Sequence, residues 1–325
     1  MGNVLILAAA SPPDLPRSAF ELLSAAKELQ DRLGGEVQAL LLGSEMAHAG
    51  KDLIEHGADR VLVTEHRSLS PHETDLMLVA LETAVKAVSP TAILFPHDRV
   101  GQELGPRLAY RLRAGIVTDC TGLEVEDGRI RWIRPVYGGK AMAVMSIEGP
   151  VQIVTLRPKA FAPSAADTSR AGEIQHLEVA LPPAGPVELV EVVRGEVEEG
   201  PSIDEAPIVV SGGRGIGGPE GFQKLEELAR LLGGAVGASR PAVDSGWMSH
   251  ARLIGQTGKI ISPDLYIAIA ISGAPQHMTG VSSAKTIVAI NRDEDAPIFK
   301  MAHVGVVGDW RQVVPALIRA LESGD

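Results

Sequence analysis

Two hydrophobic periods alternate along the first 112 residues of the chain. Short apolar runs are each followed by a longer stretch in which apolar residues recur every three or four positions. The runs predict strands over 4–10, 37–42, 60–64 and 91–95, and the amphipathic stretches predict helices over 18–33, 44–56, 71–88 and 99–112. Four successive strand–helix units predict a parallel sheet with right-handed crossovers.

The pattern changes after Thr121. Short strands at 123–125 and 130–133 flank Asp127-Gly128, which predicts a hairpin with a type I′ turn. Strands over 141–147 and 151–155 add to this antiparallel portion, which we expect to extend or flank the parallel sheet and so to make the first sheet mixed. Proline, glycine and charged residues accumulate over 191–206, and we place there a linker between a first domain, 1–190, and a second domain, 207–325.

The second domain opens with a strand that breaks into a glycine-rich turn, VVSGGRGIGG, at 209–218, and a helix predicted over 219–232 follows at once. Exposed amide hydrogens and a helix N-terminus favour an anion, and Arg214 adds a positive charge. Gly213, Gly215 and Gly218 match the spacing of a dinucleotide fingerprint, but no acidic residue stands about 20 positions on to hold a ribose. A nucleotide site and a plain tight turn both remain open on this evidence.

Further strands are predicted at 235–238, 265–271, 285–290 and 303–307, with a last helix over 309–322 that Pro315 is expected to kink or to start later. This domain is predicted to be a doubly wound α/β domain. Polar residues stand near the expected strand ends: Ser239-Arg240, 255–259, 272–277, Asn291 and Asp309. Ligands of open α/β sheets lie at the carboxyl ends of the strands. Each residue also has an ordinary explanation as a turn residue, a helix cap, a surface charge or a structural histidine, but together they favour a ligand.

Composition narrows the possible functions. The net charge is −11 and the basic residues are scattered, which argues against a nucleic-acid surface. Hydrophobic residues make up 45% and aromatic residues only 3%, which is typical of parallel α/β cores built from aliphatic side chains. No segment is long enough to insert into a membrane, and the one cysteine, Cys120, suits a reducing cytoplasm. The histidines lack metal-ligand spacing, so we expect no metal site.

Arg240, Thr257 and His277 suggest a particular chemistry. A flavin ring gains negative charge on reduction, and a cation, a hydroxyl and an imidazole nearby would stabilise that charge. The sequence offers no convincing carboxylate pair or activated nucleophile, which favours an electron carrier over an enzyme with its own substrate turnover.

At these residues the chain resembles the alpha subunit of electron-transfer flavoproteins. The resemblance rests on a series of motifs in order: VVSGGRG, VGASRPAVD, GQTGKIISPDLYIAIAISGAPQH, AKTIVAINRDEDAPIF and an aspartate, Asp309, before the last helix. In the first domain GQELGPRLAYRL, RPVYGGKA and TLRPKAF are similar to the family's pattern. Trp310, where an aliphatic residue is expected, and the segment GWMSHARLI at 246–254 depart from it.

The resemblance implies that the second domain binds FAD. It places Arg214 and Ser239 near the pyrophosphate, Thr257 near flavin N5, Arg240 near the ring and His277 at the O2 edge. Asn291, Asp309 and Trp310 would hold the adenosine half. The full set of cofactor-binding residues expected on this basis is Arg214, Gly215, Ser239, Arg240, Ile254, Gly255, Gln256, Thr257, Ser272, Gly273, Ala274, Pro275, Gln276, His277, Asn291, Asp309 and Trp310.

The resemblance also implies partners. The family works as a heterodimer with a beta subunit that covers the flavin and commonly holds AMP. It carries electrons from flavin dehydrogenases, such as the acyl-CoA dehydrogenases of fatty acid beta-oxidation, to a quinone oxidoreductase in the membrane. Some relatives instead bifurcate electrons from NADH with a second flavin, and others serve nitrogen fixation. An NAD-binding enzyme of the deoxyhypusine-synthase type and a scaffold subunit without cofactor are the further alternatives.

Overall fold

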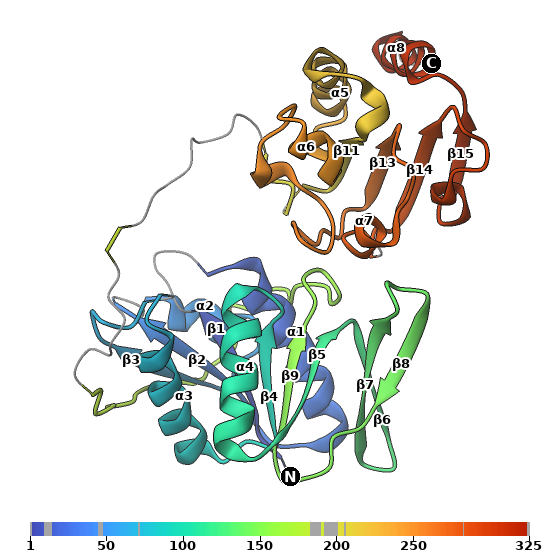
Figure 1. The fold of residues 1–325 in the computed structure, drawn as a ribbon. Helices are drawn as coiled ribbons and strands as arrows, with labels where there is room; N and C mark the ends of the chain where they lie inside the picture. The colour runs from blue at the N-terminus through green and yellow to red at the C-terminus, as the bar shows by residue number, and fades with distance from the viewer. Residues whose placement is uncertain are drawn as a thin grey trace. The chain divides into compact units, whose positions relative to one another are not determined.

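In the computed structural model of the chain, the structure describes residues 2–9, 15–44, 48–70, 72–182, 190–191, 201–204, 206–281 and 283–323. These residues divide into two compact units: one is formed by 1–136 with 142–193, the other by 137–141 with 194–325 (Figure 1). Most of the linker expected at 191–206 lies outside the described residues, so its place and the domain boundaries stay predictions.

The first unit is built on a seven-stranded parallel sheet in the order β10-β3-β2-β1-β4-β9-β5. Its strands are β1 (Val4–Ala9), β2 (Val37–Gly43), β3 (Arg60–Glu65), β4 (Ala92–Pro96), β5 (Gly115–Cys120), β9 (Gln152–Leu156) and β10 (Glu173–His176). Its helices are α1 (Arg17–Leu33), α2 (Ala49–Glu55), α3 (Thr74–Val88) and α4 (Arg99–Leu112).

Alternate residues of the central strands feed two separate cores, because successive side chains of a strand point to opposite faces. Val4 and Ile6 pack with α1 and α2 on one face. Leu5 and Leu7 pack with α3 and α4 on the other. Both faces of the sheet are therefore covered, as expected for parallel strands that are apolar throughout.

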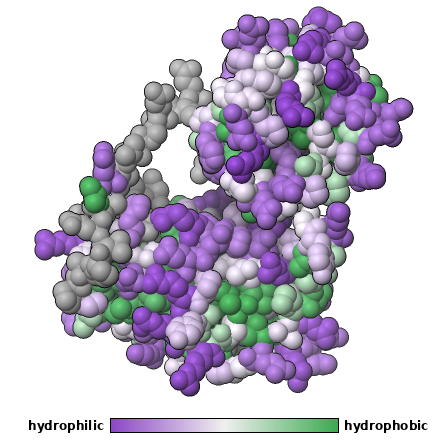
Figure 2. Space-filling view, viewed as in Figure 1, coloured by the Kyte–Doolittle hydropathy of each residue, from purple (hydrophilic) through white to green (hydrophobic). Residues whose placement is uncertain are grey.

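The hairpin predicted around Asp127-Gly128 is confirmed. Strands β6 (Gly122–Glu126) and β7 (Arg129–Val136) pair antiparallel, and Asp127 and Gly128 have φ of +50° and +73°, as a type I′ turn requires. With β8 (Ala141–Met145) they form a separate three-stranded sheet. On the face seen in Figure 2, hydrophilic side chains cover most of the second unit, whereas apolar residues gather on part of the first.

The expected position of strand 151–155 is wrong. We expected it in the antiparallel portion, but β9 lies between β4 and β5 and runs parallel to both. The physical reason is burial on both faces: Ile153 and Val154 are fully buried, each in a different core. The sequence analysis also missed β5 and β10.

The second unit is a doubly wound α/β domain, as predicted. Its five strands are all parallel and lie in the order β12-β11-β13-β14-β15. They are β11 (Ile208–Gly212), β12 (Ala235–Ala238), β13 (Leu265–Ile269), β14 (Thr286–Asn291) and β15 (Val304–Val307). The direction of strand order reverses between β11 and β13, which is the switch point where such sheets bind ligands.

One face of this sheet is covered by two long helices, α5 (Pro219–Leu231) and α8 (Trp310–Ser323). The other face is covered by loops and by the short helix α7 (Pro275–Thr279). α6 (Arg240–Asp244) follows β12 directly. Pro315 lies inside α8, which begins at Trp310, so the expected later start is wrong. Among the helices of the described ranges, none is long and apolar enough to cross a membrane.

Candidate functional site

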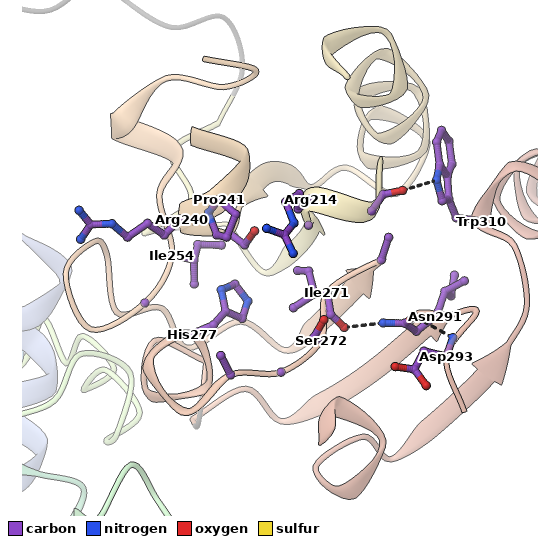
Figure 3. Close-up of a pocket in the computed structure, with 18 of the residues that line it drawn as sticks. Arg214, Arg240, Pro241, Ile254, Ile271, Ser272, His277, Asn291, Asp293 and Trp310 are labelled. Atoms are coloured by element: carbon purple, nitrogen blue, oxygen red, sulfur yellow. Dashed lines mark hydrogen bonds between the residues drawn. The ribbon is translucent and has the colours of Figure 1, made fainter. Parts of the chain in front are cut away.

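A pocket of about 800 Å³ opens at the carboxyl ends of β11 to β14, within the second unit (Figure 3). Its volume lies within the roughly 300–1,000 Å³ of sites for small ligands and cofactors. The pocket brings together all the residues predicted from the sequence except Pro275, which does not line it: Arg214, Gly215, Ser239, Arg240, Ile254, Gly255, Gln256, Thr257, Ser272, Gly273, Ala274, Gln276, His277, Asn291, Asp309 and Trp310.

The glycine turn after β11 forms one wall. A Cβ added to Gly213 would lie 2.1 Å from the Ala270 carbonyl oxygen, so only glycine lets the turn pass this close to the end of β13. Ala270 has a φ of +53°, a conformation that ends β13 two residues earlier than predicted. Such strained backbone clusters at binding sites.

The turn presents donors and a positive charge. Among the described residues, no hydrogen-bond partner is recorded for the amide N–H of Arg214 or Gly215. The side chain of Arg214 is exposed, and no carboxylate among the described residues pairs with it. In Figure 3 its guanidinium lies near the centre of the residues drawn. The arrangement suits an anionic group such as a phosphate.

Arg240 and Thr257 meet on another wall. Arg240 Nη1 donates to Thr257 Oγ1 at 3.1 Å, and its Nε donates to Asp244 Oδ2 at 3.4 Å. Both charged side chains are about 60% exposed, so this ion pair contributes little to stability. In Figure 3 Arg240 extends away from Arg214. The sequence analysis missed Asp244, although it stands four residues after Arg240, the spacing of a helical ion pair.

His277 is a neutral imidazole. It is only 7% exposed, and burial lowers its pKa to about 4, while interaction with the Ile254 backbone opposes this shift weakly. At neutral pH it can therefore donate or accept a hydrogen bond but carries no charge. Its Nε2 lies 2.7 Å from the hydroxyl oxygen of Tyr266, a fully buried residue of β13 that the sequence analysis did not single out.

Asn291 and Asp309 have structural roles in the pocket rim. The Asn291 amide donates to the Ile271 carbonyl at 2.9 Å and accepts from the Asp293 N–H at 3.0 Å, which fixes the ends of β13 and β14. Asp309 accepts from the Arg311 N–H at 2.9 Å and so caps α8. The ordinary readings of both as a turn residue and a helix cap therefore fit, beside their places in the pocket.

Trp310 ties the last helix to the glycine turn. Its Nε1 donates to the Gly215 carbonyl at 3.2 Å, and the Arg311 guanidinium lies 5.0 Å from its ring centre. The bulky side chain therefore holds one edge of the pocket instead of closing it. Gly273, which also lines the pocket, has a φ of +82°, and a Cβ there would lie 2.5 Å from the Ile298 nitrogen.

The pocket also contains residues outside the expected cofactor-binding set: Gly213, Pro241, Asp244, Ala270, Ile271, Ile290, Arg292, Asp293, Gly308 and Arg311. Most directly follow or precede a named residue at a strand end, so adjacency could have found them. In the described part of the chain, no group of three or more His, Cys, Asp or Glu side chains could hold a metal ion.

Comparisons with known proteins agree with this geometry. Residues 4–182 match the family model described as the electron transfer flavoprotein domain, and residues 202–282 match the electron transfer flavoprotein FAD-binding domain.

Individual relatives match over nearly their whole length. The electron transfer flavoprotein subunit alpha of Bacillus subtilis is 40% identical over 97% of this chain and 96% of its own. That of Thermoanaerobacterium thermosaccharolyticum is 41% identical over 94% and 93%, and the protein FixB of Clostridium saccharobutylicum is 39% identical over 97% and 95%. The chain therefore belongs to the family of electron transfer flavoprotein alpha subunits.

Proposed function

We propose that the pocket of the second unit binds FAD and that the chain serves as the alpha subunit of a heterodimeric electron carrier. The lining of the pocket carries the proposal. Free amide donors and Arg214 line one wall of a cavity of cofactor size, and Thr257, Arg240 and His277 line another. The match of this unit to a family model for FAD binding supports the same cofactor.

The residues present fit the chemical groups of FAD. Amide N–H groups at a glycine turn and a guanidinium suit a pyrophosphate. The turn is built for close approach, since a side chain at Gly213 would collide with backbone. When bound, FAD would supply redox chemistry in one- or two-electron steps. Arg240 and Thr257 would offer positive charge and a hydroxyl to a ring that becomes more negative on reduction.

The pocket carboxylates support a carrier role over substrate turnover. Asp244 faces Arg240 and Asp309 faces Arg311, each as an exposed ion pair. Asp293 accepts a hydrogen bond from the N–H of Asp295 and also lies at the rim. A general acid or base must be free to reach the reacting group, whereas Asp244 and Asp309 are already paired with arginines.

The carrier needs partners, which we propose from the family. A beta subunit holding AMP would complete the heterodimer and cover the flavin. Flavin dehydrogenases, such as acyl-CoA dehydrogenases, would donate electrons, and a quinone oxidoreductase would accept them. If instead the heterodimer bifurcates electrons, it will hold a second flavin and be reduced by NADH, so flavin content and NADH reduction distinguish the two.

An NAD-binding enzyme is the less well supported alternative. A dinucleotide-binding domain of that type carries an acidic residue at the end of its second strand to bind the ribose. Here β12 ends at Ala238 and is followed by Ser239 and Arg240. No acidic residue therefore stands at the end of β12 itself, and Asp244, further along the chain, is paired with Arg240.

The test is uptake of FAD by the chain purified with its beta subunit. We expect a visible flavin spectrum that bleaches on anaerobic reduction. Arg214→Gln should weaken FAD binding about tenfold, because it removes one charge-assisted contact, whereas Arg230→Gln, an exposed arginine on α5 outside the pocket, should leave it unchanged. A colourless complex that takes up no added FAD, or one that binds NAD instead, would refute the proposal.

A further inference from the structure

Tyr266 and His277 form a buried polar pair behind the pocket wall. Tyr266 stands on the central strand β13 and is fully buried, and His277 stands on α7 and lines the pocket. The two side chains approach from different elements, with 2.7 Å between the phenol oxygen and Nε2.

The phenol is the donor in this hydrogen bond. Burial raises the pKa of Tyr266 far above its ordinary value, so the hydroxyl keeps its proton. A buried hydroxyl proton requires an acceptor. Ser211, on the neighbouring strand β11, lowers the pKa of Tyr266. However, Ser211 Oγ accepts no hydrogen bond from the phenol. Nε2 is therefore the acceptor, and it must be unprotonated.

The other ring nitrogen is consistent with this assignment. A neutral imidazole has one N–H, so a bare Nε2 places the proton on Nδ1. Nδ1 is buried without a hydrogen-bond partner among the described residues. The Ile254 backbone raises the pKa of the ring, which means that it favours a protonated ring nitrogen. A proton on Nδ1 agrees with this effect.

We propose that Tyr266 is a positioning residue that fixes His277 as the neutral tautomer with its proton on Nδ1. The ring then has a single donor left, and its acceptor is already occupied. If the pocket binds FAD, as proposed above, His277 meets it as a neutral ring of fixed orientation, because Nε2 is bonded to Tyr266 and Nδ1 is itself buried. The assignment of the tautomer does not itself depend on FAD.

The direct test is nitrogen NMR of the full chain, in complex with its beta subunit and labelled with ¹⁵N-histidine. Chemical shifts separate a protonated from a bare ring nitrogen, and the signals lost in His277→Asn identify the residue. We expect a protonated Nδ1 and a bare Nε2 with or without FAD. A protonated Nε2 would overturn the proposal.

Variants separate positioning from mere packing. Tyr266→Phe keeps the ring and removes only the donor, so we expect a mixture of both tautomers. Ser211→Ala should leave the tautomer unchanged, as should Tyr110→Phe, a control at an exposed tyrosine of the first unit. An unchanged tautomer in Tyr266→Phe would show that Tyr266 does not fix it. If this variant fails to fold, the spectrum of the unmodified chain still decides the assignment.

Cofactor binding gives a second readout. Tyr266→Phe should weaken FAD binding by no more than about tenfold, because it frees the His277 ring without removing an atom that contacts the ligand. If FAD does not bind the unmodified complex, the proposed function fails while the NMR result stands. If FAD binds normally and Nε2 is protonated, the proposed function stands and the role of Tyr266 is refuted.

Discussion

Acid should destabilise the second unit through His277. The ring is buried, and its pKa falls from 6.5 to about 4 in the folded state. Between these pKa values the unfolded chain binds a proton that the folded chain does not bind, so the unfolded state is stabilised relative to the folded state as the pH falls. The stabilisation is fully present above about pH 6.5 and is lost as the pH falls through 4. The difference between these two pKa values corresponds to about 3 kcal/mol.

A difference measurement isolates this contribution. Amide hydrogen exchange of peptides from β13 and α7 reports the local free energy of opening, measured at pH 7, 6, 5 and 4 for the FAD-free chain and for His277→Asn. Other titrating groups act equally in both proteins. Burial also lowers the pKa of His97, but this residue belongs to the first unit and not to the unit that contains β13 and α7. We expect the advantage of the unmodified chain to shrink by about 3 kcal/mol over this range.

A constant difference between the two proteins would refute the reasoning. It would mean that the ring is protonated with equal ease in the folded and unfolded states, and therefore that it is not desolvated. If the unmodified chain instead became more stable relative to His277→Asn as the pH falls, the pKa of His277 would be raised in the folded state. That result would require a carboxylate facing the ring.

Three further predictions concern other residues. Arg157→Met should lower the free energy of unfolding of the first unit by about 3–5 kcal/mol, because it leaves Asp119 without the guanidinium that binds both of its oxygens at 2.7 and 2.6 Å; denaturant unfolding should also show that adding Asp119→Leu recovers part of the loss. Gly273→Ala should cost about 1–3 kcal/mol and weaken FAD binding, since a φ of +82° and the nearby Ile298 nitrogen leave no room for a Cβ; a thermal midpoint like that of the unmodified chain would contradict this. Arg240→Ala should lower the redox potential of bound FAD because a cation near developing negative charge is lost, and an unchanged redox titration, with Arg240→Lys as the control that keeps the charge, would exclude this role.

Local chemistry made much of the fold predictable. Asp127-Gly128 specifies a type I′ turn by itself, and the strand, glycine turn and proline after β11 specify where α5 begins. These features depend on residues that are neighbours in sequence. The carboxyl edge of the second sheet was predictable for the same reason, because each strand end is marked by polar residues that follow directly.

Long-range pairing was not predictable in this way. The apolar run of β9 fits an antiparallel strand as well as a parallel one. Only its pairing with β4 and β5, about 60 and 37 residues away in the sequence, decides between the two directions. Strand β10 has four exposed residues and pairs only with β3, so its hydrophobic pattern carries almost no signal. Strand β5 has the sequence GIVTDC. Its isoleucine, valine and threonine favour a strand, but its glycine and aspartate do not.

The same difference between local and long-range contacts applies to the pocket. The residues that line it follow from local motifs, but the charge that each one offers depends on partners elsewhere in the chain. Sequence motifs indicated four cationic or polar groups, Arg214, Arg240, Thr257 and His277, but not which of them carry an unpaired charge. The structure gives them unequal roles: His277 is neutral and bonded to Tyr266, and Arg240 shares its charge with Asp244. Arg214 alone of these lies at the glycine turn without a carboxylate partner among the described residues. Because an unpaired cation interacts more strongly with an incoming anion than one already paired, Arg214 should contribute more to cofactor affinity, and Arg240 more to redox potential.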